Sequence, residues 1–183
     1  ADLRRIGRLW LLYAWLDFTW VTRDLKTVLI YIVSDALVGV TAITGLLLLA
    51  ERFGAIGVWS RDQIIFMLGY ATLARGLIDV FFGYNVAFIS RRVGRGQLDH
   101  ALIQPQPVWL GLLTDGFNPF SSSGELFPAF ALLLWSSHRL ALTITPGWLA
   151  LFLANLAASC AIILAYTFVW GSIAFWAPRA AEE

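Results

Sequence analysis

The sequence has few of the residues on which common enzyme active sites are built. Its 183 residues include one cysteine, one methionine and two histidines, and charged residues account for 14% of the chain. The only lysine is Lys26, and no G-x-x-x-x-G-K-[ST] loop is present, which excludes a P-loop nucleotide site in this chain. The HExxH, CxxC and GxSxG motifs of metal, redox and serine catalysis are missing as well. Cys160 stands alone in an apolar run, so it forms no intrachain disulfide and has no neighbouring metal ligand.

Charge of either sign is also scarce. The formal net charge is +1, so the chain is not expected to present a surface for nucleic acid. Hydrophobic residues make up 59% of it, whereas soluble domains average about 45–50% apolar and about 25% charged residues. Nine tryptophans fit aromatic belts at two membrane interfaces. Composition therefore predicts an all-α, multi-pass helical membrane protein, with residues 1–183 in a single transmembrane domain.

The hydrophobic runs divide the chain into a surface helix and four spans. Residues 2–20 predict a helix on the membrane surface, because the side chains of Arg4, Arg5 and Arg8 fall within an arc of roughly 100° and tryptophans follow them. The alternative is a plain cationic leader into the next span. Each predicted span is long enough to cross about 30 Å of hydrocarbon; the four are residues 27–50, 64–90, 117–137 and 148–176.

Arginine and lysine lie mostly on one side of these spans. Nine of them flank the side that holds the N-terminus, the loop of residues 91–107 and the C-terminus, and three flank the other side. Short loops rich in lysine and arginine stay in the cytoplasm. The N-terminus and the 91–107 loop are therefore predicted to be cytoplasmic, and an even number of spans agrees with that arrangement.

Three charged residues fall well inside the predicted spans. Asp35 lies about a third of the way along the first span, where a carboxylate costs a few kcal/mol on insertion scales. It could mark a substrate or proton path, but a hydrogen bond between packed helices, or masking near the interface, is the favoured interpretation. Arg75 and Asp79 are four residues apart on one helix face, so they can pair and reduce the cost of burying charge. A structural pair within the helix is favoured over a transport site.

A glycine stripe marks one face of the second span. Gly69, Gly76 and Gly83 recur every seven residues. Small residues on one stripe let a neighbouring helix approach closely. The stripe therefore predicts a helix packed against this face.

The longest interruption of the apolar pattern is the stretch 90–107. It begins with three arginines within five residues, Arg91, Arg92 and Arg95, and ends with two prolines. Proline stops a helix, so the stretch has room for one short helix after Gly96. An apolar edge for that helix would come from Val93, Leu98, Leu102 and Ile103.

Asp99 and His100 form the one candidate acid–base pair of this loop. A membrane-embedded enzyme could use them together. Adjacent residues of a helix point about 100° apart, however, which suits a joint catalytic role poorly. A loop without chemistry, used as an interface, is therefore favoured, and His138 stands alone in a later loop.

This loop and the order of elements resemble the membrane subunit of an ABC-2 type ABC transporter, as found in a bacterial family of permeases. The surface helix, two spans, loop and further spans follow in the same order over nearly the whole chain. Members of that family have six spans, so the resemblance implies that this chain covers the first four. The specific match is an arginine-rich turn, then Gly-x-Leu-Asp, a leucine and a proline, which here are Arg91, Arg92, Arg95, Gly96, Leu98, Asp99, Leu102 and Pro105.

The resemblance also implies partners. The 91–107 loop would be a coupling helix docked on a separate ATPase subunit, with its arginines at the headgroups or on that subunit. ATP and Mg would bind the partner ATPase, and this chain would hold neither a cofactor nor a metal. Two permeases, identical or different, would enclose the pathway in the bacterial cytoplasmic (inner) membrane, with export as the usual direction. A scaffold subunit without transport is a further alternative, and nothing in the sequence identifies a substrate.

Overall fold

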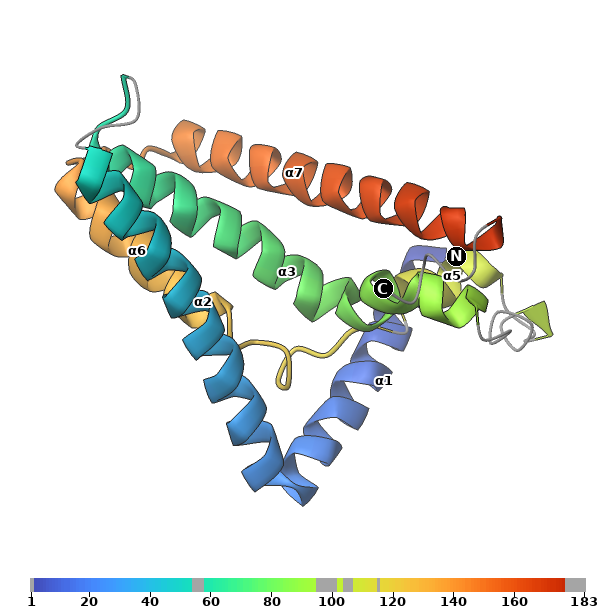
Figure 1. Cartoon of the computed structure of the whole chain (residues 1–183). Coiled ribbons are helices and arrows are strands. Elements are labelled where there is room, and N and C mark those ends of the chain that lie inside the picture. The colour runs from blue at the N-terminus through green and yellow to red at the C-terminus, as the bar shows by residue number, and fades with distance from the viewer. Residues whose placement is uncertain (1, 54–57, 95–101, 104–106, 115, 177–183) are drawn as a thin grey trace.

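The computed structural model describes residues 2–53, 58–94, 102–103, 107–114 and 116–176. Figure 1 shows how their helices are arranged. The all-α class predicted from composition is confirmed for these residues. The helices are α1 (Asp2–Arg23), α2 (Leu25–Phe53), α3 (Arg61–Gly94), α5 (Val108–Thr114), α6 (Leu126–Arg139) and α7 (Pro146–Ser172), followed by the 3₁₀ turn η1 (Ile173–Phe175).

Three of the described helices are long and apolar enough to cross a membrane. The qualifying stretches are Leu25–Gly45 in α2, Arg61–Phe82 in α3 and Pro146–Ser172 in α7. They correspond to the first, second and fourth spans expected from the sequence. The predicted third span is the one that differs.

One helix is expected over residues 117–137, but α6 begins only at Leu126 and has 14 residues, which gives it a length of about 21 Å. The preceding residues 116–125 form turns and irregular chain. Pro119 cannot donate a helical hydrogen bond, while serine and glycine favour turns over helix interiors. The third hydrophobic element is therefore a short helix that follows a stretch of non-helical backbone.

The central element is α3, which touches α2, α5, α6, α7 and η1. The short helix α6 runs antiparallel to it. Near one end of this contact, Nε of Arg139 lies 3.9 Å from Oδ2 of Asp62. Further along, Leu126 of α6 meets Gly76 of α3. The irregular chain before α6 is thereby placed beside the middle of α3, away from its start.

The long helix α7 runs parallel to α3 along its other side (Figure 1). The ring of Phe152 packs edge-on against Tyr70, with 5.6 Å between centroids. Two turns further along α7, the hydroxyl of Ser159 lies 2.7 Å from the hydroxyl of the same Tyr70. These contacts fix the register of the two helices, while most of the circumference of α7 stays exposed.

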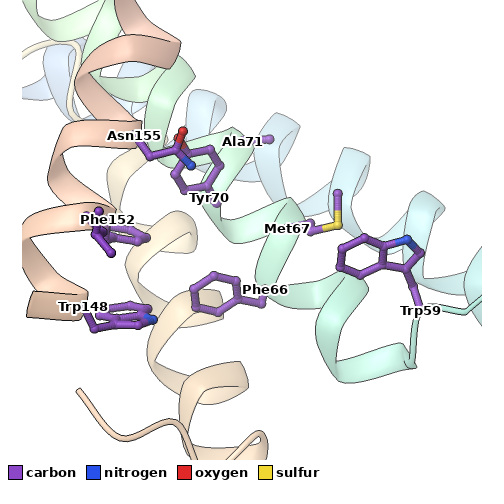
Figure 2. Close-up of a pocket in the computed structure, with 9 residues that line it drawn as sticks. Trp59, Phe66, Met67, Tyr70, Ala71, Trp148, Phe152 and Asn155 are labelled. Carbon is purple, nitrogen blue, oxygen red and sulfur yellow. The ribbon is translucent and has the colours of Figure 1, made fainter. Parts of the chain in front are cut away.

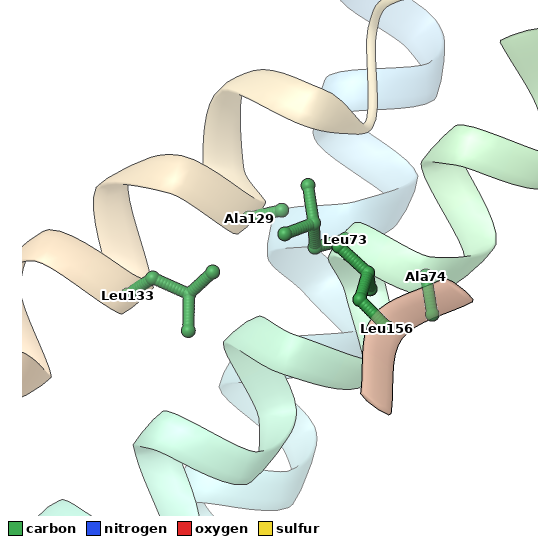
Figure 3. Packing of buried hydrophobic residues seen from close by; sticks show 5 residues of the cluster. All are labelled: Leu73, Ala74, Ala129, Leu133 and Leu156. Atoms are coloured by element: carbon green, nitrogen blue, oxygen red, sulfur yellow. The ribbon is translucent and has the colours of Figure 1, made fainter. Parts of the chain in front are cut away.

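The apolar core lies where α3, α6 and α7 meet (Figure 3). Its buried side chains are Leu73 and Ala74 of α3, Ala129 and Leu133 of α6, and Leu156 of α7. In a bilayer, lipid tails are as apolar as leucine, so close packing stabilises such a core more than removal from water does. The small residues Ala74 and Ala129 permit that close packing.

Two glycines of the predicted stripe, Gly69 and Gly76, receive α6, as their spacing predicts. A Cβ atom on Gly69 would lie 3.1 Å from Cβ of Leu132, and one on Gly76 would lie 2.8 Å from Cδ2 of Leu126. Larger side chains at these positions would push α6 away. The stripe thus sets the distance between the two helices.

The first two helices meet at Asp24 and diverge from there like the arms of a V (Figure 1). The carboxylate of Asp24 accepts a hydrogen bond from the backbone N–H of Thr27 at 3.2 Å, which caps the start of α2. From this junction α1 extends back to contact α5, whereas α2 extends to contact α3 and α6.

Candidate functional site

Four charged side chains from three parts of the chain meet beside α3. They are Asp35 of α2, Arg75 and Asp79 of α3, and Glu125, which directly precedes α6; we call these four the charged cluster. Nε of Arg75 lies 3.4 Å from Oε2 of Glu125 and 3.9 Å from Oδ2 of Asp79. The pair expected between Arg75 and Asp79 is therefore present, but Glu125 is the closer partner of the guanidinium.

Asp35 joins the cluster because α2 and the chain before α6 almost touch. A Cβ atom on Gly124 would lie 2.8 Å from Cβ of Asp35 and 2.8 Å from the carbonyl oxygen of Ile32. Only glycine leaves room for this approach. Asp35 is close enough to interact electrostatically with Arg75, Asp79 and Glu125. Within the described residues, the cluster thus contains three carboxylates and one guanidinium.

The irregular chain that delivers Glu125 to the cluster is held in place from two sides. The carboxylate of Asp17, in α1, accepts hydrogen bonds from the backbone N–H groups of Phe120 at 2.8 Å and Ser121 at 3.2 Å. On the α3 side, the N–H of Asn118 donates to the carbonyl oxygen of Val80 at 2.9 Å. Since Asp17 is only 6% exposed, its hydrogen bonds are shielded from solvent.

Replacing Asp17 with alanine is expected to lower the free energy of unfolding by about 1–3 kcal/mol, because two partly buried N–H groups lose their acceptor. The measurement is the thermal unfolding midpoint of the detergent-purified protein. Asp24→Ala is the matched control, since Asp24 is exposed and caps only one N–H group, a change worth about 1 kcal/mol. Equal losses in the two variants would show that Asp17 does not hold the irregular chain.

The charged cluster lies at the depth of the candidate spans. Its α2 and α3 members fall inside the stretches Leu25–Gly45 and Arg61–Phe82. At such depth irregular backbone is tolerated only where it is buried in protein or lines a water-filled cavity. Yet the side chain of Arg75 is 71% exposed, against 13% for its partner Glu125. The cluster is therefore open on its Arg75 side, where hydrocarbon would be a poor neighbour for a guanidinium.

A groove of about 650 Å³ lies between α3 and α7, and the side chains that line it are drawn in Figure 2. Aromatic rings dominate its walls, and the rings of Trp148 and Phe152 stack with 5.2 Å between their centroids. The amide of Asn155 supplies a polar group at one end (Figure 2). The remaining rings are those of Trp59, Phe66 and Tyr70.

Most of the predicted coupling loop lies outside the described residues. Arg91 and Arg92 form part of the last turn of α3, which extends to Gly94. Leu102 and the adjacent Ile103 are described, and both side chains are exposed. Val93 also falls within α3. The remaining loop residues singled out from the sequence lie outside the described ranges: Arg95, Gly96, Leu98, Asp99, His100 and Pro105.

Two residues that organise the site were missed by the sequence analysis. Glu125 is hidden in a stretch whose hydrophobicity predicts a membrane helix, and Asp17 lies in an apparently apolar run of α1. A signal for Glu125 does exist, because Pro119, three serines and Gly124 interrupt the apolar pattern just before it. No local signal distinguishes Asp17, since its hydrogen-bond partners are distant in the sequence.

Comparison with known proteins gives one match. A family model described as "ABC-2 family transporter protein" matches residues 36–182. The matched stretch takes in α3, α5, α6, α7 and most of α2, and it leaves out α1 and Asp35. No curated protein and no solved structure matches the chain.

Proposed function

This chain belongs to the ABC-2 family of transporter proteins, and we propose that it is the permease subunit of a bacterial exporter that works as a dimer with separate ATPase subunits. Membership of the family makes it a membrane permease component of an ABC transporter, a class of transport subunit without catalytic activity of its own. ATP and Mg would then act on the partner ATPase. The observation that carries the proposal is the family match over most of the chain, on a fold with three helices fit to cross a membrane.

The charged cluster supports a pathway between two permeases. Charged side chains inside a membrane almost always face a bundle interior or a water-filled cavity. Arg75 is exposed in the isolated chain, so a second permease or water must cover it in the membrane. Transporters commonly place such groups where a helix is interrupted, and here the interruption is the irregular chain ending at Glu125.

The coupling role is proposed for the 91–107 loop. Its described apolar residues, Leu102 and Ile103, are exposed, as a segment docked on a soluble partner would be when that partner is absent. ATP binding would close two ATPase subunits, and the loops would pass this rigid-body motion to the spans. In the proposed topology the loop and the N-terminus lie in the cytoplasm and the protein in the inner membrane. The nine-to-three distribution of basic residues supports this orientation.

A pull-down from the native membrane tests this proposal. The tagged chain is extracted in a gentle detergent, and the eluate is scored for a P-loop ATPase. We expect about one ATPase per permease, as the association of separate subunits through one loop each requires. Recovery of the chain alone, or only with copies of itself, would show that no ATPase subunit is bound and would contradict the proposal.

A further inference from the structure

The exposed positions of α3 form a single ridge. Between Arg61 and Phe82 the helix is covered nearly all round, and its exposed residues are Arg61, Gln63, Met67, Ala71 and Arg75. Four of the five are spaced by four residues, so they follow one another along one side of the helix. Between residues 61 and 82, the central helix of the bundle therefore presents mainly this ridge to its surroundings.

The composition of the ridge does not suit lipid. Residues that face hydrocarbon are large and apolar, as on α7 away from the groove, where Leu153, Ile162 and Val169 are among the exposed side chains. The α3 ridge instead carries the amide of Gln63 and the guanidinium of Arg75. The guanidinium of Arg75, well inside the span, would lose its hydration in hydrocarbon. Gln63 lies in the first turn of α3, where its Oε1 accepts a hydrogen bond from the backbone N–H of Ser60 at 2.8 Å. The ridge therefore faces water or another protein in the membrane.

The aromatic groove lies directly on this ridge. Met67 and Ala71 of the ridge line the groove together with the rings of Phe66, Tyr70 and Phe152 (Figure 2). Mainly apolar walls, a few polar groups and a volume of about 650 Å³ are typical of a site for a small organic molecule. Aromatic faces also attract cations through their quadrupole.

The charged cluster follows the groove along the same ridge. Arg75 is one helical turn beyond Ala71, a rise of about 6 Å. Its guanidinium is already engaged by Glu125 and approached by Asp79. With Asp35 also close to Arg75, the cluster has more carboxylates than guanidinium groups, and this excess of negative charge lies on the turns of α3 just beyond the groove. A cation reduces that excess, whereas an anion adds to it.

We infer that the groove and the charged cluster form one binding site for an amphipathic organic cation, whose apolar body lies among the aromatic rings while its positive group meets the carboxylates. The inference rests on the proposed function, since such a cation would be a substrate of the transporter. The apolar body is held by stacking against Trp148 and Phe152. The positive group draws Asp79 away from Arg75, which leaves the guanidinium paired with Glu125.

The test compares two ions of nearly identical shape and opposite charge, tetraphenylphosphonium and tetraphenylborate. Their saturable binding to the detergent-purified full chain is measured by equilibrium dialysis, above that of protein-free micelles. We expect the cation to bind about tenfold or more tightly than the anion. Equal affinities, a preference for the anion, or no saturable binding of either ion would overturn the inference, and this comparison requires no variant.

Substitutions then locate the site. Asp79→Asn is expected to weaken binding of the cation by about tenfold, and Phe152→Ala by several-fold through loss of ring stacking. Ile162→Ala, on the outer side of α7, is the control and should leave binding unchanged. A cation preference that persists in the Asp79→Asn, Asp35→Asn double variant would place the binding elsewhere and defeat the inference.

Failure of this inference and failure of the proposed function can be told apart. If the ATPase co-purifies but the cation shows no preference, the chain is a permease whose substrate is of another class. If the cation binds as expected but no ATPase is recovered, the cation site is supported and the proposed role as an ATPase-coupled permease is contradicted.

Discussion

Replacing Arg75 with methionine is expected to lower the free energy of unfolding by about 2 kcal/mol. Methionine keeps much of the length of the side chain but leaves three carboxylates without their guanidinium. Breaking a buried ion pair from one side costs about 3–5 kcal/mol, and we place the loss below that range because the Arg75 side chain is 71% exposed. For a chain of this size such a loss corresponds to roughly 4–8 °C in Tm, measured on the detergent-purified protein.

A second arginine provides the matched control for this substitution. Arg139 pairs with Asp62 at 3.9 Å near the ends of α6 and α3, outside the charged cluster. Exposed pairs of this kind contribute about 0–1 kcal/mol, so Arg139→Met should change the Tm little. Similar losses in the two methionine variants would mean that the cluster has no special part in holding the fold.

Removing a carboxylate should compensate for the loss of Arg75. In the Arg75→Met background, Glu125→Gln takes away the negative charge that lies closest to the missing guanidinium. Groups in one ion-pair network couple by about 0.5–3 kcal/mol in double-mutant cycles, and here the coupling should recover part of the lost Tm. If the double variant is less stable than Arg75→Met alone, the two residues are not energetic partners.

The sequence located the charges of the cluster more readily than their arrangement. Asp35, Arg75 and Asp79 stand out because each interrupts an apolar span, and the four-residue spacing of Arg75 and Asp79 predicts that they lie close to each other. The contact with Glu125 depends on how α6 docks against α3. Periodicity within a single segment carries no information about that docking.

The third hydrophobic segment shows why hydrophobicity alone predicted the wrong start for a helix. Residues 117–137 have the length and the apolar content of a span, yet the structure begins the helix at Leu126. Backbone N–H groups of the chain before it donate hydrogen bonds to acceptors that are distant in the sequence, the carboxylate of Asp17 and the carbonyl oxygen of Val80. A local pattern cannot reveal such partners, although Pro119 and Gly124 do warn that a helix is unfavourable there.

The tryptophans give a second example of a contact that local sequence does not reveal. Their number predicts aromatic belts at the membrane interfaces, and this stays a prediction. Trp148 instead stacks on Phe152 and, together with Trp59, lines the groove beside α3. Only the parallel packing of α7 on α3 brings these rings together, so the groove could not be predicted from their positions in the chain.

Replacing Leu98 or Leu102 with aspartate is expected to reduce the ATPase recovered in the pull-down by about tenfold or more. Truncating or charging an apolar anchor at the centre of an interface costs about 2 kcal/mol or more, and tenfold corresponds to about 1.4 kcal/mol. The described residue of the two, Leu102, is exposed, so aspartate there should leave the Tm of the isolated chain unchanged.

Ile144→Asp is the control for these substitutions. Ile144 is also apolar and exposed, but it lies in the loop before α7, on the opposite side of the membrane in the proposed topology. Its replacement should leave ATPase recovery intact. If the Leu98 and Leu102 variants retain the ATPase as well as Ile144→Asp does, the 91–107 loop is not the docking segment. The contact would then have to involve another cytoplasmic element, of which α1 and α5 are the described candidates.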